Sequence, residues 1–338
     1  MTDAAMDERE SALFLYEEAM AYTYSAALRV AARVGLGDAL AGGTRTLDEL
    51  AAATGADAGG LYRVLRLLAA RGIVAEAGAG RFRLTDRGSA LRGDAAVPAG
   101  PGVLMFTDTM FWRMTHAVGD IIRDPDPSFA SVFGRSLADY FGGDEETEAV
   151  YYEGMATVSE AEHPALVRCY DFPDQGVVAD VGGGRGGLLR AVLSAHPGLR
   201  GILLDQPHVV KAHRLDDFEA ARRVEVVAGD FLAGVPAADL YLIKRILHNW
   251  DDRHSVRILR NCRDAMAPHG RVVVIDAVVP AGPEAHQSKQ MDFMMLAAMT
   301  GQERTLEQLR HLFAAAGLRL TRVVGTPTPM TMVEGVRA

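Results

Sequence analysis

The stretch VVADVGGGRGGLLRAVL, residues 177–193, constrains the fold of this chain more than any other. It reads as a buried strand, a glycine-rich turn and a helix. Glycines in such a turn let the backbone adopt positive φ angles and approach a ligand closely. Gly182, Gly184 and Gly187 have the G-x-G-x-x-G spacing of a dinucleotide site, and Asp205 follows about twenty residues later. The sequence therefore predicts a nucleotide-binding α/β unit, and a nicotinamide cofactor remains one possibility at this point.

The C-terminal half of the chain continues this alternation of strands and helices. Short apolar runs separated by helical patterns predict a parallel sheet that is covered on both faces. Two further candidate strands end the chain, and the short TPTP segment between them favours antiparallel pairing. We therefore expect an α/β fold with seven strands. The predicted strands are 177–181, 202–205, 224–229, 239–243, 271–276, 318–325 and 330–335.

Residues 11–98 are predicted to be mostly helical. One helix ends at Gly55, and a second, with leucines at helical spacing, ends at Gly72. The glycine-rich segment that follows, 73–88, reads as a small hairpin. Helix, turn, helix and hairpin form a winged-helix pattern. A DNA-binding regulator is therefore one interpretation of this part of the chain.

Residues 99–170 form a second helical stretch, rich in methionine and aromatic side chains. Helix packing explains any one of these residues. Their density in 105–118 nevertheless indicates an apolar wall suited to a flat aromatic ligand. We divide the chain into a winged-helix-like dimerisation domain (1–98), a helical substrate-pocket region (99–170) and a cofactor-binding catalytic domain (171–338).

Charge and composition argue against several classes of protein. The net charge of −9 disfavours a nucleic-acid partner, since phosphate binding needs a local excess of lysine and arginine. No run of apolar residues is long enough to predict a membrane span, and the acidic first residues do not resemble a signal peptide. Cys169 and Cys262 provide neither a disulfide framework nor a metal cluster. We expect a cytoplasmic protein without a bound metal.

Three acidic positions narrow the choice of cofactor. Asp180 lies inside the end of the strand before the glycine turn, which suits a cationic amino-acid group better than a pyrophosphate. Asp205 ends the second strand and can accept hydrogen bonds from two ribose hydroxyls, although capping of the next helix explains it equally well. Asp230 and Phe231 follow the third strand, where an acid and an aromatic ring suit an adenine. Adenosine with a methionine tail fits this order of residues best.

Six motifs together carry a resemblance to a known family. They are ADVGGGRGG, LLDQP, AGDF, LIKRILHNWDD, VVVIDAVVP and GQERT. The chain resembles class I S-adenosylmethionine-dependent methyltransferases, specifically the small-molecule O-methyltransferases of the caffeic-acid and hydroxyindole type, over nearly its full length. Bacterial members of that group tailor aromatic natural products. The resemblance implies a Rossmann-like methyltransferase sheet of seven strands and a winged-helix domain that forms a homodimer instead of contacting DNA.

The resemblance also implies which residues bind the cofactor, S-adenosylmethionine, whose product is S-adenosylhomocysteine. They are Asp180, Gly182 and Gly184 at the methionine tail, Asp205 at the ribose, Asp230 and Phe231 at the adenine, and Lys244 as a further lining residue. A solvated charge at the end of a strand is the alternative explanation for Lys244.

A histidine stands in the segment ILHNWDD, residues 246–252, where no capping rule explains it. A phenol is a weak nucleophile, so a base of near-neutral pKa assists its methylation, and histidine meets that need. By resemblance, His248 takes the hydroxyl proton while Asp276 and Glu303 orient its ring. A helix cap at Asp276 and a surface acid at Glu303 are the simpler alternatives. We interpret the neighbouring Asp251 as the N-cap of the next helix.

The predicted function is S-adenosylmethionine-dependent O-methylation of a phenolic or other hydroxyl on an aromatic or polyketide-type secondary metabolite. One alternative is an N- or C-methyltransferase on the same scaffold. Two others are a ligand-responsive winged-helix regulator, whose recognition helix would carry Arg63, Arg66 and Arg71, and an NAD-dependent oxidoreductase.

The acceptor pocket is expected to draw on three apolar segments, 105–114, 155–163 and 291–299. Large apolar side chains in such segments suit an aromatic acceptor. The residues predicted to line this pocket are Met105, Phe111, Trp112, Met291 and Met295.

Overall fold

The computed structural model describes two compact units of the chain. The first comprises residues 1–109 and 145–158, and the second comprises 110–144 and 159–338. The segment 99–170 therefore contributes to both units. The residues described are 7–123, 129–135, 139–140, 145–298 and 301–338.

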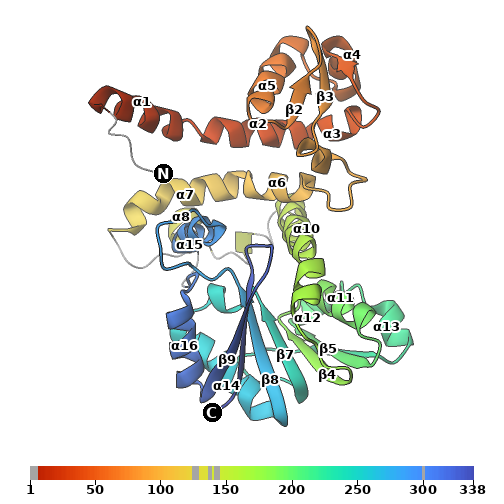
Figure 1. Ribbon diagram of the computed structural model, residues 1–338, viewed down its shortest axis with the longest axis vertical. Helices are drawn as coiled ribbons and strands as arrows, with labels where there is room; N and C mark the ends of the chain where they lie inside the picture. Colours follow the sequence, from red (N-terminus) through yellow and green to blue (C-terminus); the bar gives the residue numbers. More distant parts are fainter. Residues whose placement is uncertain (1–6, 124–128, 136–138, 141–144, 299–300) are drawn as a thin grey trace. The chain divides into compact units, whose positions relative to one another are not determined.

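The first unit is helical, with a small antiparallel sheet of three strands (Figure 1). Its elements are α1 (Glu8–Ala19), α2 (Tyr22–Arg33), α3 (Leu36–Ala39), β1 (Arg45–Thr46), α4 (Leu47–Thr54), α5 (Ala58–Ala70), β2 (Val74–Glu76), β3 (Arg81–Leu84), η1 (Gly88–Leu91), α6 (Gly100–Phe106) and the first part of α10 (Glu145–Cys169).

The winged-helix pattern is present in this unit. Helix α4 begins with a reciprocal capping box between Thr46 and Glu49, and it ends at Gly55, whose φ is 67°. Strands β2 and β3 pair as the predicted hairpin. The third strand, β1, was not predicted from the sequence because only Arg45 and Thr46 belong to it. Its position depends on pairing with β3 and not on a local pattern.

Helix α1 exposes a run of apolar side chains. None of its twelve residues, all of which the structure describes, is buried. Leu13, Phe14, Leu15 and Tyr16 are each more than half exposed. An apolar run of this kind on one helix is typical of a surface that another chain covers.

The second unit contains a seven-stranded sheet and the helices that cover it. Its elements are α7 (Thr109–Ile121), α8 (Phe129–Phe133), the end of α10, β4 (Gly176–Val181), α11 (Gly187–Ala195), β5 (Leu199–Asp205), α12 (Pro207–Val210), α13 (Asp216–Ala220), β6 (Val224–Ala228), β7 (Ala238–Lys244), η2 (Leu247–Asn249), α14 (Asp252–Ala265), β8 (Met266–Asp276), α15 (Gln287–Ala298), α16 (Leu306–Ala315), β9 (Leu318–Gly325) and β10 (Thr331–Arg337).

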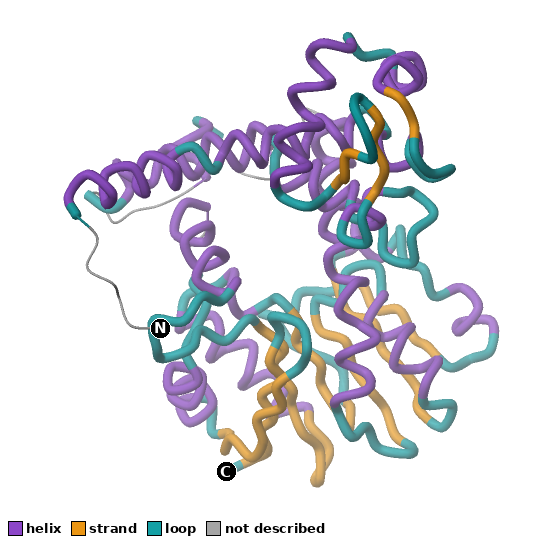
Figure 2. The backbone as a smooth tube through the Cα atoms, turned by 45° about the horizontal axis from the view of Figure 1, so that its top comes forward, coloured by secondary structure: helices purple, strands orange, loops and turns teal. Residues whose placement is uncertain are grey.

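The order of the strands in this sheet is β6-β5-β4-β7-β8-β10-β9. Strands β4 to β8 run parallel, and β10 runs antiparallel to both of its neighbours, β8 and β9. The prediction of seven strands with an antiparallel pair at the end of the chain is therefore confirmed. Figure 2 shows these strands in orange, with helices on both sides of the sheet.

Alternate residues of each central strand enter two separate cores, one on each face of the sheet. In β7, Tyr241 and Ile243 pack with α14 and α16, whereas Leu240 and Leu242 pack with α10 and α11. This period of two explains why the parallel strands read as continuous apolar runs in the sequence. Because both faces are covered, ligands have access only at the ends of the strands.

Within the described residues, no helix is both long enough and apolar enough to cross a membrane.

Candidate active site

The carboxyl ends of the parallel strands gather most of the predicted site residues at one edge of the sheet. Parallel strands place their carboxyl ends together, and ligands of open α/β sheets bind there. The residues at or just after these ends are Asp180 in β4 and Gly182 after it, Asp205 at β5, Asp230 after β6, Lys244 at β7 and Asp276 at β8.

The glycine turn after β4 is closely packed against its neighbours. Gly182 has a φ of 69°, and a Cβ there would lie 2.5 Å from Ile246 Cδ1 and 3.4 Å from a ring carbon of Phe231. A Cβ at Gly183 would lie 2.4 Å from Asp180 Cγ. Gly184, by contrast, has open space around the position of its missing Cβ. The turn therefore fits against Asp180 and Phe231 while leaving its outer backbone accessible.

Asp180 lies beneath this turn as a buried carboxylate. It is 1% exposed, and its Oδ2 atom has no hydrogen-bond partner among the described residues. Burial raises the pKa of the Asp180 carboxyl to about 7, although Lys244 opposes that rise, while Asp205 adds to it. A buried acid with an unused oxygen is a place where a cationic ligand group would be stabilised.

Asp205 joins the end of β5 to the glycine turn. Its Oδ2 accepts a hydrogen bond from the Gly184 amide at 2.8 Å, and its Oδ1 accepts one from the Gln206 amide at 2.7 Å. The helix-cap interpretation of Asp205 is wrong, because α12 has Gln206 at its N-cap position and no side-chain cap. Asp205 instead fixes the outer part of the turn, and its remaining lone pairs are available to a ligand.

Phe231 and Asp230 lie beyond β6. The Phe231 ring packs edge-on against Trp250 at 6.1 Å between centroids, and its carbonyl accepts a hydrogen bond from Asn261 at 2.7 Å. Asp230 Oδ1 accepts from the Leu232 amide at 2.8 Å. The structure thus brings Phe231 against the glycine turn, while Asp230 stabilises the loop that carries it.

Lys244 at the end of β7 is 8% exposed, so the solvated-charge interpretation is wrong. Its Nζ lies 2.7 Å from Glu162 Oε2 and donates to Ser159 Oγ at 2.6 Å. Glu162 also pairs with Arg245. Burial acts to raise the pKa of Glu162, but Lys244 and Arg245 together outweigh it and lower that pKa. Burial also lowers the pKa of Lys244.

Glu162 and Arg245 were not singled out from the sequence, although Glu162 lies within the segment 155–163 predicted for the acceptor pocket. Glu162 occurs among other acids in a helical stretch, and nothing in that stretch marks it as buried. Arg245 has a φ of 55°, uncommon for a residue other than glycine, and its side chain is 10% exposed. Its presence in the LIKR segment next to Lys244 was the only available signal.

His248 lies in the short 3₁₀ helix η2 and is 6% exposed. Its Nδ1 is 2.7 Å from Glu303 Oε1, and Glu303 is itself 3% exposed, so the surface-acid interpretation of Glu303 is wrong. The Glu303 amide donates to Asp292 Oδ1 at 2.9 Å. Because a carboxylate only accepts hydrogen bonds, Nδ1 carries the ring proton and Nε2 presents a lone pair. This is the arrangement of a general base with an orienting acid.

Asp276 has a different part in this group. Its Oδ1 accepts a hydrogen bond from the Arg245 amide at 3.1 Å, and no bond joins it to the His248 ring in the described part of the chain. The next described helix, α15, begins only at Gln287, so the helix-cap interpretation of Asp276 is wrong. Burial raises the pKa of Asp276 to about 6; nearby His248 opposes this rise, and the neighbouring Glu303 carboxylate adds to it. The carboxylate bonded to the His248 ring is thus Glu303, and the prediction that Asp276 also orients this ring is not borne out by a hydrogen bond between them.

Asp251 is the N-cap of α14, as predicted. Its Oδ1 accepts from the His254 amide at 2.8 Å. Arg304, which follows Glu303, is also buried, and the sequence did not single it out.

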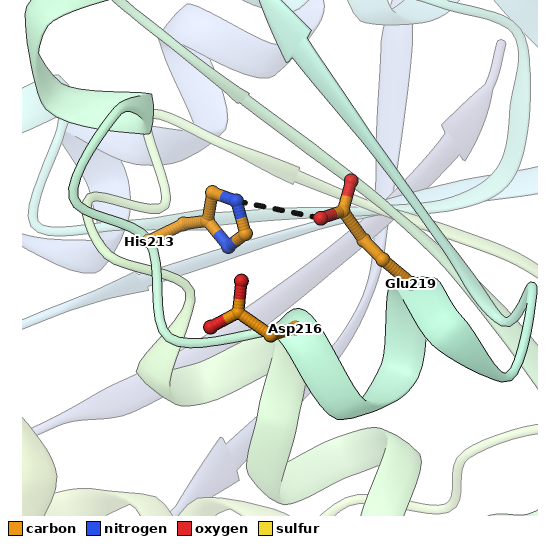
Figure 3. A group of neighbouring side chains, drawn as sticks. All are labelled: His213, Asp216 and Glu219. Atoms are coloured by element: carbon orange, nitrogen blue, oxygen red, sulfur yellow. Dashed lines mark ion pairs between the residues drawn. The ribbon is translucent and has the colours of Figure 1, made fainter.

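His213, Asp216 and Glu219, none of them a predicted site residue, form a cluster of potential metal ligands (Figure 3). His213 Nδ1 accepts a hydrogen bond from the Leu215 amide at 3.2 Å, which leaves the ring proton on Nε2. That nitrogen lies 3.4 Å from Glu219 Oε2, as the dashed line in Figure 3 marks. With both nitrogens engaged, the cluster is explained by a histidine–carboxylate contact.

The residues predicted for the acceptor pocket differ in their burial. Met105 belongs to the first unit and packs against Gly154, where a Cβ would lie 2.4 Å from that of Met105. In α7, Phe111 is buried and Trp112 is 40% exposed.

In α15, Met291 and Met295 are half-buried, and Met291 Sδ lies 3.7 Å from Arg245 Nη1. Met299, at the end of the methionine-rich segment, lies outside the described residues. Met291, a predicted pocket residue, therefore contacts the residue that follows β7.

Comparison with known proteins places this geometry in a family. Residues 16–93 match the O-methyltransferase dimerisation domain, and residues 115–319 match the O-methyltransferase domain. The chain therefore belongs to the S-adenosylmethionine-dependent O-methyltransferase family.

Three proteins illustrate the similarity. CalO1, a methyltransferase of calicheamicin biosynthesis solved with S-adenosylhomocysteine, is 63% identical, with a TM-score of 0.94 and coverage of 99% of this chain and 100% of that one. The 2,7-dihydroxy-5-methyl-1-naphthoate 7-O-methyltransferase of Streptomyces carzinostaticus is 39% identical, covering 86% of this chain and 88% of its own. The phenazine-1-carboxylate N-methyltransferase of Pseudomonas aeruginosa is 33% identical, and the match covers 91% of this chain and 92% of that enzyme. The family assignment removes the NAD-dependent oxidoreductase and the regulator from consideration.

Proposed function

We propose that this enzyme methylates a hydroxyl group of an aromatic or polyketide-type secondary metabolite, with His248 as the general base. The observation that carries the proposal is the 2.7 Å contact between His248 Nδ1 and the buried Glu303. That contact leaves Nε2 as the ring atom able to accept a proton. A hydroxyl needs this help far more than an amine, because a phenol has a pKa of about 10.

S-adenosylmethionine fits the residues at the carboxyl edge of the sheet. The unpartnered Oδ2 of Asp180 favours a positive charge above the glycine turn, which the ammonium of a methionine tail has. The open outer side of Gly184 gives such a tail room to approach the backbone. Asp205 has lone pairs left for ribose hydroxyls, and Phe231 offers an aromatic face for adenine. Lys244 lines the same edge from β7.

The protein's part in the chemistry is alignment and proton transfer. When bound, S-adenosylmethionine supplies an electrophilic methyl group on a sulfonium. His248 Nε2 accepts the hydroxyl proton as the oxygen attacks, and Glu303 stabilises the imidazolium that results. Orientation of the reacting groups by the site supplies a further contribution, about 7–11 kcal/mol in well-oriented model reactions.

The acceptor class is supported by the relatives and by the apolar segments of the chain. The Streptomyces carzinostaticus enzyme is named for a hydroxyl of a naphthoate, an aromatic acceptor. The methionines of α15 and the aromatic side chains of α7 suit a flat apolar molecule. We also propose a cytoplasmic location, which the two free cysteines, Cys169 and Cys262, support.

N-methylation is the second candidate, because the Pseudomonas aeruginosa relative is named as an N-methyltransferase. A neutral ring nitrogen has a lone pair already available and loses no proton before attack. Retention of His248 together with Glu303 favours the oxygen acceptor.

Binding of S-adenosylhomocysteine is expected to raise the melting temperature of the protein. A ligand that binds only the folded state at one hundred times its Kd stabilises it by about 2.7 kcal/mol, which corresponds to a shift of several degrees. Differential scanning fluorimetry across a titration of S-adenosylhomocysteine measures this shift, with NADH as the control ligand. A shift with NADH and none with S-adenosylhomocysteine would contradict the cofactor assignment.

A charged residue on the exposed face of α1 is expected to weaken the homodimer. We propose that the partner subunit covers the apolar residues of α1, so Leu15→Glu places an unpaired charge in the interface. Loss of a central apolar contact raises the dimer dissociation constant by about 30-fold or more. Sedimentation velocity over a range of concentrations measures it, and the exposed Glu18→Gln on the same helix is the matched control. A dimer as tight as that of the wild type would place the interface elsewhere.

A further inference from the structure

Arg304 is buried beside the turn that carries His248. Its Nη1 donates to the Leu247 carbonyl at 2.8 Å, and its Nη2 donates to the Trp250 carbonyl at 2.7 Å. These two carbonyls stand on either side of His248 in the chain. The guanidinium therefore connects the beginning and the end of the turn that positions the base.

The turn needs such support because it has little stability of its own. A single 3₁₀ turn has poor hydrogen-bond geometry and leaves its last carbonyls without partners inside the helix. Ser255 Oγ also donates to the Leu247 and Trp250 carbonyls, but at 3.3 Å in both cases. Arg304 makes the shorter bonds, and its rigid planar fork holds two acceptors at a fixed separation.

The segment around Arg304 is itself fixed in place. The Arg304 carbonyl accepts a hydrogen bond from the Val279 amide at 2.9 Å, just beyond the end of β8. A Cβ at Gly301 would lie 2.0 Å from the His248 carbonyl oxygen, so this segment passes directly against the turn. The backbone that carries the Arg304 side chain is thus held both by the segment after β8 and by the turn of His248.

The ion pair of Arg304 with Asp252 does not account for its burial. The Arg304 side chain is 2% exposed, whereas that of Asp252 is 65% exposed. An ion pair with a largely solvated acid adds little to stability. The contacts that Arg304 makes away from solvent are those with the two backbone carbonyls.

We propose that Arg304 is a positioning residue for methyl transfer. Glu303 holds the His248 ring through Nδ1, and Arg304 holds the backbone on both sides of that ring. Together these two adjacent residues determine where Nε2 points. The proposal rests on the function of His248 as the general base.

The first test is Arg304→Gln, which keeps a polar side chain but cannot bridge both carbonyls. A reacting group misplaced by about 1 Å costs on the order of 100-fold in rate, so we expect kcat to fall about 10- to 100-fold. The Kd for S-adenosylhomocysteine should stay within a factor of two, because Arg304 touches none of the cofactor residues. Arg304→Lys should recover part of kcat by bonding one of the two carbonyls.

The decisive test repeats Arg304→Gln in the His248→Ala background, with labelled methyl donor to measure the slow residual turnover. If Arg304 acts only through His248, the second substitution causes no further loss, because groups that act as a unit are not additive. Arg223 is the matched control: its Nη2 donates to the carbonyls of Leu193, His196 and Leu199 near the start of β5. Arg223→Gln should lower the melting temperature with kcat unchanged.

Several outcomes would overturn the proposal. These are an Arg304→Gln enzyme with wild-type kcat, an equal loss in both backgrounds, or a loss of cofactor affinity that matches the loss in kcat. Each would show that Arg304 stabilises the fold without positioning His248. Failure of the proposed function looks different, since His248→Ala would then keep the kcat of the wild type.

Discussion

Replacing His248 by alanine is expected to lower kcat by about 10²- to 10⁴-fold, the range over which a positioned general base contributes. Without the imidazole, the hydroxyl proton has no acceptor that Glu303 orients, and the attacking oxygen remains neutral. Cofactor affinity should stay near that of the wild type, since the residues proposed to bind it lie at other strand ends. The loss is therefore expected in kcat and not in the Kd for S-adenosylhomocysteine.

Turnover by mass spectrometry and cofactor binding by calorimetry separate these two quantities. His254 is a suitable control, because it lies on the same segment and contacts Asp251 at 2.7 Å instead of Glu303. His254→Ala should keep nearly full turnover. If His248→Ala turned over at the wild-type rate, alignment alone would drive the transfer, and an acceptor that loses no proton, such as a ring nitrogen, would become the better assignment.

Replacing Asp180 by asparagine is expected to weaken S-adenosylhomocysteine binding by about 10- to 100-fold at pH 8, the size of a hydrogen bond to a charged group. The variant removes the buried negative charge that a ligand ammonium would compensate. Wild-type affinity should also decrease as the pH falls below about 7, because burial raises the pKa of Asp180 to that value and protonation removes the charge. The variant should lack this pH dependence.

The same substitution that weakens cofactor binding at pH 8 should stabilise the ligand-free protein at that pH. The ordinary pKa of Asp180 is 3.8, and in the folded protein it is about 7. Between these values the folded state binds more protons than the unfolded state, so stability is lost as the pH rises through this window. The melting temperature of Asp180→Asn, relative to that of the wild type, should therefore increase from pH 5 to pH 8.

Calorimetry at several pH values and thermal melts without ligand measure the two effects. Asp239 is a matched control, because it is exposed and its Oδ2 accepts from the Val177 amide at 2.8 Å, at the beginning of β4. Asp239→Asn should leave the affinity and its pH dependence unaltered. An Asp180→Asn enzyme that bound S-adenosylhomocysteine as tightly as the wild type at pH 8 would show that the cofactor does not sense this charge.

The strands of the sheet could be predicted from the sequence because each carries its own pattern. Strand β9 lies where the sequence places it, at 318–325, and the starts of β4, β6 and β7 differ from prediction by at most one residue. Strand β8 begins earlier than expected, at Met266, in a segment with Pro268 and Gly270 that reads as a turn. Pairing of Met266 with Ala238 extends the strand there. Tertiary pairing overrides local propensity at this point.

The candidate site likewise contains residues that a local sequence pattern identifies and residues that only long-range contacts place. Asp180, Asp205 and His248 stand next to recognisable strand ends, so the sequence identifies them. Arg245 and Arg304 are placed by partners that are far away in the chain, 83 residues for Glu162 and 57 for Leu247. No local sequence pattern indicates a contact between residues so far apart in the chain.

Residues 303–305 combine three separate duties in consecutive positions. Glu303 contacts the ring of His248, Arg304 bridges the backbone around it, and Thr305 is the N-cap of α16 through a capping box with Gln308. An insertion or deletion of a single residue here would misplace at least two of these groups at once. Length variation, which surface loops commonly tolerate, is therefore expected to be absent from this segment in any functional variant of the enzyme.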